Sequence, residues 1–179
     1  MRQAFIENED AYTKESIMIK LQPISEENFD QVLELKASEK FVASNSYSLA
    51  QAYLSLLDTI ATGELPRLPY AILNDETVIG FVMLWFCPLE DDDDPAFKGD
   101  YFWITRFMID EKEQGKGYGK AAMAVLLDMF RAKLNGHEAK YVYLSYEPSN
   151  HVAAKLYESC GFTETGLEMG GEVVVELVL

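Results

Sequence analysis

A glycine-rich turn between an apolar, strand-like run and an amphipathic segment is the feature that most constrains this fold. Residues 107–120 read FMIDEKEQGKGYGK and contain three alternate glycines, Gly115, Gly117 and Gly119. Because glycine lacks a Cβ atom, the chain can turn tightly here and bring its backbone close to a ligand. A helix after such a turn presents the positive end of its dipole. The pattern therefore predicts a strand, an anion-binding turn and a helix.

Spacing separates three kinds of phosphate-binding turn. A dinucleotide fingerprint requires G-x-G-x-x-G, and the third glycine here comes one residue early. A P-loop requires four residues between its glycines and Ser or Thr after the lysine, whereas Ala121 follows Lys120. The pattern that fits is Q-x-x-G-x-G, formed by Gln114, Gly117 and Gly119. A nucleotide-phosphate protein is therefore the weaker alternative.

A second element lies downstream and is also preceded by a strand-like run. YVYLSY at 141–146 is followed by PSNHVAAKLYESCGF at 148–162. This second segment combines Asn150, a short helix that carries Tyr157, and a glycine-phenylalanine exit. Two strand-turn-helix elements in this order are far more specific than either one alone.

The two motifs together resemble those of the GNAT superfamily of N-acetyltransferases, over 68–179 and, with fewer matching features, over 17–67. The resemblance implies one α+β domain (α/β/α-like) at 17–179, preceded by an N-terminal extension at 1–16. It implies a mixed, mostly antiparallel sheet whose two central parallel strands splay apart, flanked by helices. The runs FVASNSYSLAQAYL, WITRFMID and GGEVVVEL further resemble bacterial spermine/spermidine acetyltransferases of the BltD type.

The resemblance also implies acetyl-CoA as the acetyl donor. Its pantetheine arm would pair with the strand edge at Phe107, Met108 and Ile109, and a backbone N–H near Met108 would stabilise the reaction's oxyanion. The pyrophosphate cradle would consist of Gln114, Gly115, Lys116, Gly117, Tyr118, Gly119 and Lys120.

Two residues of the second motif each have a catalytic and a structural interpretation. Tyr157 matches the tyrosine that protonates the departing thiolate in many GNAT enzymes, and it could instead be a core aromatic residue. Asn150 would contact the cofactor or simply cap the helix.

The proton acceptor for the attacking amine is left open. Some polyamine acetyltransferases have a glutamate two residues before the segment that matches Phe107, where this chain has Thr105. Glu147 follows one strand-like run and Glu172 begins another, and both runs lead toward the same cleft. Either carboxylate could accept the proton or bind a distal ammonium. Both could instead be ordinary solvated carboxylates. The candidate contacts with the acceptor come from the helical region and are Asn45, Ser46 and Tyr47. The alternative interpretation is that these three residues form an ordinary loop between two helices.

Composition narrows the functional classes. Thirty acidic against 15 basic side chains give a net charge of −15, which repels nucleic acid and attracts a polycation such as spermidine or spermine. Two scattered cysteines and two histidines indicate neither a disulfide framework nor a metal site. We expect a cytoplasmic bacterial enzyme, not bound to a membrane, that acts on a small-molecule amine and forms a homodimer. The alternatives are another amine acceptor (a peptide N-terminus, a lysine, an amino acid or an amine drug) and a non-catalytic acetyl-CoA-binding regulatory domain.

The remaining pattern predicts the other elements. Ser48 and Gln51 form a capping box at the start of a second helix, and Gly80 suggests a β-bulge. The expected strands lie at 17–23, 68–73, 77–89, 101–109, 141–146 and 172–179, and the expected helices at 25–36, 48–62 and 117–134.

Overall fold

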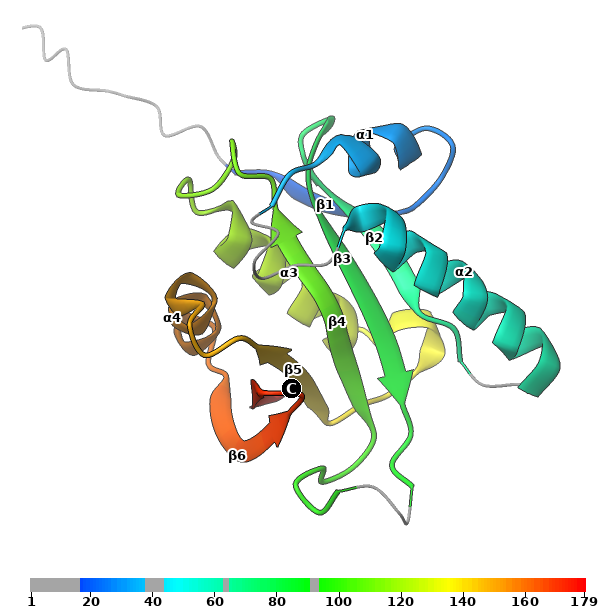
Figure 1. The fold of residues 1–179 in the computed structure, drawn as a ribbon, viewed down its shortest axis with the longest axis vertical. Coiled ribbons are helices and arrows are strands. Elements are labelled where there is room, and N and C mark those ends of the chain that lie inside the picture. Colours follow the sequence, from blue (N-terminus) through cyan, green and yellow to red (C-terminus); the bar gives the residue numbers. More distant parts are fainter. Residues whose placement is uncertain (1–16, 38–43, 63–64, 91–93) are drawn as a thin grey trace, which may run out of the picture.

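The computed structural model describes residues 17–37, 44–62, 65–90 and 94–179, and the predicted extension at 1–16 lies outside them. Its strands form one sheet in the order β1-β2-β3-β4-β5-β7-β6 (Figure 1). Among the described strands, β4 and β5 are the parallel pair, and every other neighbouring pair is antiparallel. The strands are β1 (Ile19–Pro23), β2 (Leu68–Asn74), β3 (Thr77–Cys87), β4 (Tyr101–Ile109), β5 (Tyr141–Tyr146), β6 (Thr163–Met169) and β7 (Glu172–Val178). The predicted fold class is confirmed.

Helices cover both faces of this sheet. They are α1 (Phe29–Glu34), α2 (Asn45–Thr62), α3 (Tyr118–Arg131) and α4 (His151–Ser159), with a short 3₁₀ turn at Leu134–Gly136. Side chains on β3 alternate between the faces: Phe81 and Met83 pack toward α1 and α2, whereas Val82 and Leu84 pack toward α3 and α4. Strands covered on both faces read as continuous apolar runs, which is why the sequence predicted β3 and β4 well. None of the described helices is both long and apolar enough to cross a membrane.

The start of α2 corrects the predicted capping box. The helix begins at Asn45, and Ser48 is a buried residue inside its first turn. Ser44 takes the capping position, since its Oγ accepts a hydrogen bond from the backbone N–H of Tyr47 (3.2 Å). The Gln51 amide donates to the Tyr47 hydroxyl oxygen instead of reaching back to the backbone. Serines at 44, 46 and 48 made the pattern ambiguous, and packing against the sheet selected the register.

Three further boundaries differ from the prediction. α1 starts at Phe29 rather than Ser25, because Ser25 Oγ accepts from the N–H of Glu27 within a turn. α3 ends at Arg131, earlier than predicted, and Lys133 and Asn135 then adopt positive φ. β6 escaped prediction because its mostly polar sequence, TETGLEM, is largely exposed. Its only signal was the Gly170-Gly171 pair, whose positive φ values form the turn into β7.

The bulge predicted near Gly80 is confirmed. Gly80 pairs with Ile72 and Val78 pairs with Leu73, so Ile79 is the extra residue on β3. Gly80 also lets β3 approach β4 closely: a Cβ atom here would lie 2.4 Å from the carbonyl oxygen of Met108. Glycine at this position therefore sets the distance between two central strands.

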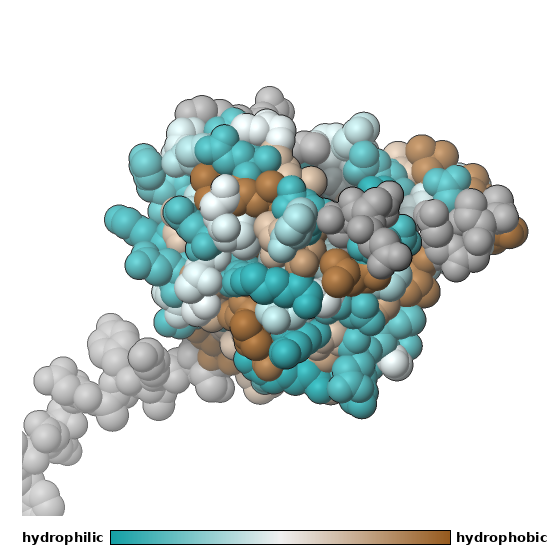
Figure 2. All heavy atoms as spheres, turned by 90° about the horizontal axis from the view of Figure 1, so that it is seen from below, coloured by the Kyte–Doolittle hydropathy of each residue, from teal (hydrophilic) through white to brown (hydrophobic). Residues whose placement is uncertain are grey.

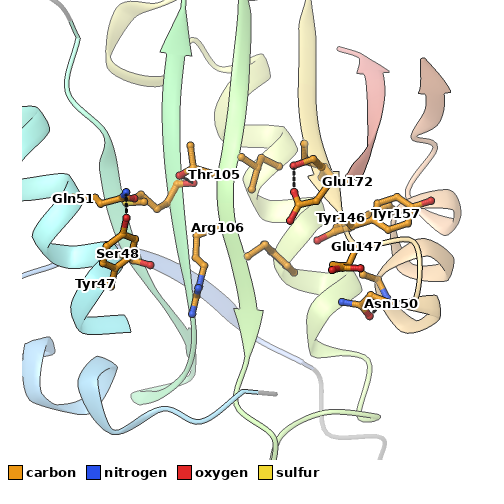
Figure 3. A pocket seen from close by; sticks show the side chains of 16 residues that line it. Tyr47, Ser48, Gln51, Thr105, Arg106, Tyr146, Glu147, Asn150, Tyr157 and Glu172 are labelled. Carbon is orange, nitrogen blue, oxygen red and sulfur yellow. Dashed lines mark hydrogen bonds between the residues drawn. The ribbon is translucent and has the colours of Figure 1, made fainter. Parts of the chain in front are cut away.

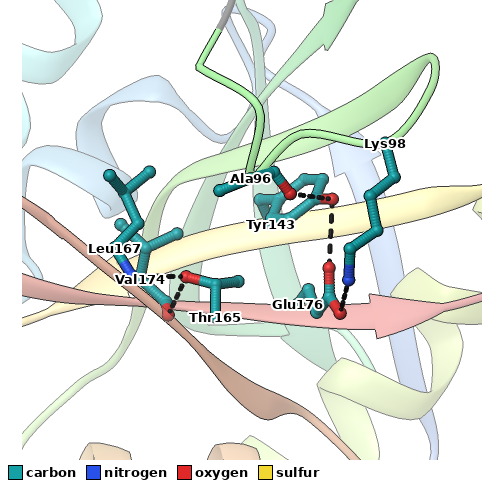
Figure 4. A network of polar contacts seen from close by, with 7 residues as sticks. All are labelled: Ala96, Lys98, Tyr143, Thr165, Leu167, Val174 and Glu176. Carbon is teal, nitrogen blue, oxygen red and sulfur yellow. Dashed lines mark hydrogen bonds and ion pairs between the residues drawn. The ribbon is translucent and has the colours of Figure 1, made fainter.

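An aromatic cluster packs at the place where β3 ends and β4 begins. The Tyr143 side chain is fully buried, and its hydroxyl donates to Glu176 Oε2 (3.1 Å), while Lys98 forms an ion pair with Glu176 (Figure 4). Burial raises the pKa of Tyr143, and the hydrogen bond to Glu176 adds to the effect. This network fastens the connection between β3 and β4 to the second half of the sheet.

Candidate active site

The two central parallel strands separate partway along their length. β4 and β5 pair only from Tyr101 with Tyr141 to Ile104 with Leu144. Directly after this point β4 contains a bulge at Thr105, because Met83 pairs with Arg106 while Leu84 pairs with Ile104. The Thr105 hydroxyl donates to the carbonyl oxygen of Met83 (3.0 Å) and fixes the bulge. A bulge bends its strand, and here it directs the rest of β4 away from β5.

The opening exposes one edge of β4 to a cavity of about 370 Å³. Beyond the bulge, Phe107, Met108 and Ile109 no longer pair with β5, so their backbone faces this space. Of the cofactor contacts predicted from sequence, those that line the cavity are Phe107, Met108, Ile109, Gln114, Gly115, Gly117, Gly119, Lys120, Asn150 and Tyr157. An extended chain lying in the cavity could pair with the β4 edge as an added strand.

The glycine turn forms the second wall of this cavity. Gly115 and Gly117 adopt φ values of 77° and 88°, in the left-handed region that favours glycine, and Gly117 caps α3. The first N–H groups of α3 have no acceptor within the helix, and together with the helix dipole they favour an anion. α4 packs against the start of α3 here, and a Cβ atom at Gly119 would lie at an ordinary contact distance of 3.4 Å from Leu156 Cδ2.

Three side chains of the turn have structural partners. The Gln114 amide donates to the carbonyl oxygen of Ile109 (2.9 Å) and so holds the turn against the end of β4. Lys116 pairs with Glu113 (2.8 Å), which raises the pKa of the lysine, and it does not line the cavity. Tyr118 also lies outside it and accepts a hydrogen bond from Asn74 (3.4 Å). The side chains of Lys116 and Tyr118 are directed away from this cavity, so a contact of either residue with the cofactor would come from its backbone N–H, and the cofactor roles of both stay predictions.

α4 supplies a tyrosine and an asparagine to the point where two cavities meet. Asn150 Oδ1 accepts from the N–H of Ala153 (3.1 Å), so the capping interpretation of Asn150 is correct, and the residue still lines both cavities. Tyr157 also lines both, although only 7% of its surface is exposed. Burial chiefly raises the pKa of Tyr157, with smaller contributions from Cys160 and Glu172. The phenol is thus protonated at any working pH.

The second cavity, of about 270 Å³, contains the carboxylates (Figure 3). Glu147 follows the end of β5 and is exposed, whereas Glu172 begins β7 and is half-buried. The Ser145 hydroxyl donates to Glu172 Oε2, which orients that carboxylate. Glu172 is also the carboxylate whose charge acts on Tyr157. The fold therefore brings both predicted carboxylates and the predicted acid to one cavity, from three separate elements.

The α2 wall of this cavity differs from the predicted acceptor contacts. Tyr47 lines it, as expected, together with Ser48 and Gln51. Asn45 and Ser46 do not line it. Asn45 is buried behind the wall, where its amide donates to the carbonyl oxygens of Val32 and Leu35. Asn45 therefore joins α1 to α2 and is not free to bind an acceptor.

Arg106 is a cavity residue that the sequence interpretation missed. Its side chain is 7% exposed, and Nη2 donates to Asn45 Oδ1 (3.1 Å), while Nε has no hydrogen-bond partner among the described residues. Burial lowers the pKa of Arg106 to about 10. An arginine inside the apolar run WITRFMI was the available signal. Its guanidinium faces the α2 side of the cavity, across β4 from the carboxylates (Figure 3).

Comparisons with known proteins agree with this geometry. The model of the acetyltransferase (GNAT) family matches residues 29–162. A spermine/spermidine N(1)-acetyltransferase of Bacillus subtilis (strain 168) is 35% identical over 108 residues, which cover 60% of this chain and 67% of the relative. A probable spermine N(1)-acetyltransferase of Bacillus subtilis subsp. natto (strain BEST195) is 34% identical over the same extent.

Solved structures share the fold at low identity. A paia N-acetyltransferase from Thermoplasma acidophilum in complex with coenzyme A has a TM-score of 0.60 at 15% identity, covering 91% of this chain and 100% of that one. An aminoglycoside acetyltransferase in complex with coenzyme A has a TM-score of 0.66 at 18% identity, covering 90% and 95%.

The chain belongs to the acetyltransferase (GNAT) family and is an N-acetyltransferase with acetyl-CoA as its cosubstrate. The residues present fit such a molecule. The unpaired β4 edge suits a pantetheine arm with its two amides, and the bare α3 N-terminus with Gly115 and Gly117 suits a pyrophosphate. The meeting point of the two cavities, at Tyr157, is where donor and acceptor would come together.

Proposed function

We propose that this enzyme transfers acetyl to a primary amine of a polyamine, with spermidine or spermine as the preferred acceptor. The observation that carries the proposal is the acceptor cavity of about 270 Å³, in which Glu147 and Glu172 lie beside Tyr157. Two carboxylates in one cavity favour a cation with more than one amine. The net charge of −15 would also steer a polycation toward the protein. The names of the two Bacillus relatives point the same way.

The proton acceptor would be one of these carboxylates. An alkylammonium has a pKa near 10.4, so the acceptor must lose a proton before its nitrogen can attack. We favour Glu172, because Ser145 orients it and because its charge is the one that acts on Tyr157. Glu147, being exposed at the cavity mouth, would bind the distal ammonium. Acetyl-CoA supplies the acetyl group as a thioester.

Tyr157 would return a proton to the leaving thiolate. Its raised pKa keeps the proton in place but makes the phenol a weak acid. An acceptor ammonium beside Glu172 would offset the negative charge that helps to raise this pKa. Binding of the charged acceptor would therefore make Tyr157 a better proton donor. A backbone N–H near Met108 would stabilise the oxyanion.

The test is release of free thiol from acetyl-CoA with spermidine, spermine and a panel of other primary amines. We expect turnover to be highest on polyamines and to fall about 10²- to 10⁴-fold in Tyr157→Phe. Tyr141→Phe is the matched control, because Tyr141 lies on β5 and lines neither cavity. Equal turnover in the two variants would contradict the acid role of Tyr157.

The two glutamates are distinguished by their kinetic effects. Glu172→Gln should lower kcat, whereas Glu147→Gln should raise KM for spermidine and leave kcat almost unchanged. The reverse pattern would exchange their roles.

The acceptor panel tests the substrate class. Turnover confined to peptides, amino acids or amine drugs would be consistent with an N-acetyltransferase but would contradict the proposal of a polyamine acceptor. Acetyl-CoA binding without turnover on any amine would favour a regulatory domain. The cytoplasmic location stays a prediction.

A further inference from the structure

The outward side of α2 is apolar where a surface helix is normally polar. Five side chains, here called the α2 patch, are between 43% and 78% exposed: Tyr53, Leu54, Leu56, Leu57 and Ile60. The opposite side of the helix already packs on the sheet through Leu49 and Ala52. α2 lies along one flank of the molecule in Figure 1, and hydrophobic side chains reach the surface on that flank in Figure 2. A helix that is apolar all round is normally buried on both sides.

The residues of α2 argue against two kinds of binding partner for the α2 patch, a charged protein surface and an anionic membrane. Asp58 is the only charged residue in the helix sequence NSYSLAQAYLSLLDTIAT. Helices that lie on membranes are usually rich in Lys and Arg on their polar side, and α2 has neither. The net charge of −15 would also repel an anionic lipid surface. The contact that suits the α2 patch is therefore an apolar one that excludes water and has no pattern of charges.

We infer that the α2 patch is the interface of a homodimer in which α2 packs antiparallel against α2 of a second copy. A two-fold axis near Leu56 and Leu57 would place Tyr53 of one copy against Ile60 of the other, so the patch is complementary to itself. Each side chain offers roughly 100 Å² of apolar surface, so two patches together would bury about 1,000 Å², the lower limit for a stable interface. The inference does not depend on which amine is acetylated.

The dimer would also steady the acceptor cavity. Tyr47 and Gln51, in the first turns of α2, line that cavity and bond to each other. The patch lies further along the same helix, so a second copy would hold the helix against the sheet without entering the site. We expect a looser acceptor site, with a higher KM for the amine, in variants that do not dimerise.

The experiment is sedimentation equilibrium of the full chain over a concentration series, at low and high salt. We expect twice the chain mass of 20.3 kDa, and tighter association at high salt because screening reduces repulsion between two chains of charge −15. Leu57→Gln/Ile60→Gln should weaken the dimer at least 100-fold, since each change occurs in both copies. Met169→Gln, which alters a half-exposed apolar side chain on β6, is the matched control and should leave the dimer intact.

A second measurement is independent of those variants. Leu57→Cys should form a disulfide-linked dimer on mild oxidation, and Met169→Cys should not; both are made with Cys160→Ser, because Cys87 is buried and Cys160 is partly exposed. A monomeric wild-type chain at both salt concentrations would overturn the inference. So would a dimer that survives Leu57→Gln/Ile60→Gln, or one that Met169→Gln dissociates.

Discussion

Gly80→Ala should damage both stability and catalysis, although residue 80 touches neither cavity. The new Cβ atom would lie 2.4 Å from the Met108 carbonyl oxygen and 3.0 Å from Ile109 Cδ1. Ordinary contacts begin near 3.4 Å, and the nearest atom is backbone that cannot rotate away. β3 and β4 must therefore separate by about 1 Å at the point where β4 enters the donor cavity.

The magnitude follows from three contributions. Overpacking costs about 1–3 kcal/mol. A weakened ladder hydrogen bond costs about 1 kcal/mol more. Replacing glycine by alanine restrains the unfolded chain and returns about 0.4–1 kcal/mol. We expect the free energy of unfolding to fall by about 1–3.6 kcal/mol. Because Met108 moves with the strand, kcat/KM for acetyl-CoA should fall about 100-fold, as is typical of a 1 Å misplacement.

Urea denaturation and steady-state kinetics measure these two effects. Gly99→Ala is the matched control, because its new Cβ atom would lie at an ordinary 3.5 Å from the Tyr141 ring. It should change the free energy of unfolding by less than about 0.5 kcal/mol. If the two alanine variants behave alike in both assays, the close approach of β3 to β4 is not what requires glycine.

Three further predictions test other features of the structure. The pKa of Tyr143 is raised in the folded chain, so above about pH 10 the unfolded chain loses this proton first and stability falls as the pH rises. Tyr143→Phe should make that fall shallower by about 1.4 kcal/mol per pH unit, measured by urea denaturation at alkaline pH. Equal slopes in the two proteins would contradict this prediction. Asn45→Ala removes a buried amide with three hydrogen bonds and should lower the free energy of unfolding by about 2–4 kcal/mol in urea denaturation. Ser46→Ala, at the exposed neighbouring residue, should leave it almost unchanged. A small loss of stability in Asn45→Ala would make a direct contact with the acceptor the better explanation of Asn45. Gly117→Ala and Gly136→Ala each force alanine to a φ above 80° and should lose similar stability, about 1–2 kcal/mol, but only Gly117→Ala should weaken acetyl-CoA binding in calorimetry.

Local patterns in the sequence were enough to predict which residues line the cavity beside β4. The turn from Gln114 to Gly119 is defined by residues that are close in the chain and by the backbone freedom of glycine. The apolar runs of β4 and β5 are equally local, since strands buried on both faces need no partner to be recognised. Asn150 and Tyr157 could be placed on a short helix for the same reason.

Tertiary structure decided the acceptor side. Glu172 and Tyr157 come from β7 and α4, and Glu147 directly follows β5, so only the order of the strands brings them to one cavity. The bulge at Thr105, which opens the sheet, depends on pairing with β3 and leaves no mark in the sequence of β4. The burial of Arg106 and the structural role of Asn45 likewise depend on how α1 and α2 pack over that strand. The sequence by itself determined where the backbone could turn and bind an anion, because those properties belong to single residues. The position of each charge relative to the others was decided by the folded sheet, because electrostatic interactions depend on distances in space between residues far apart in the chain.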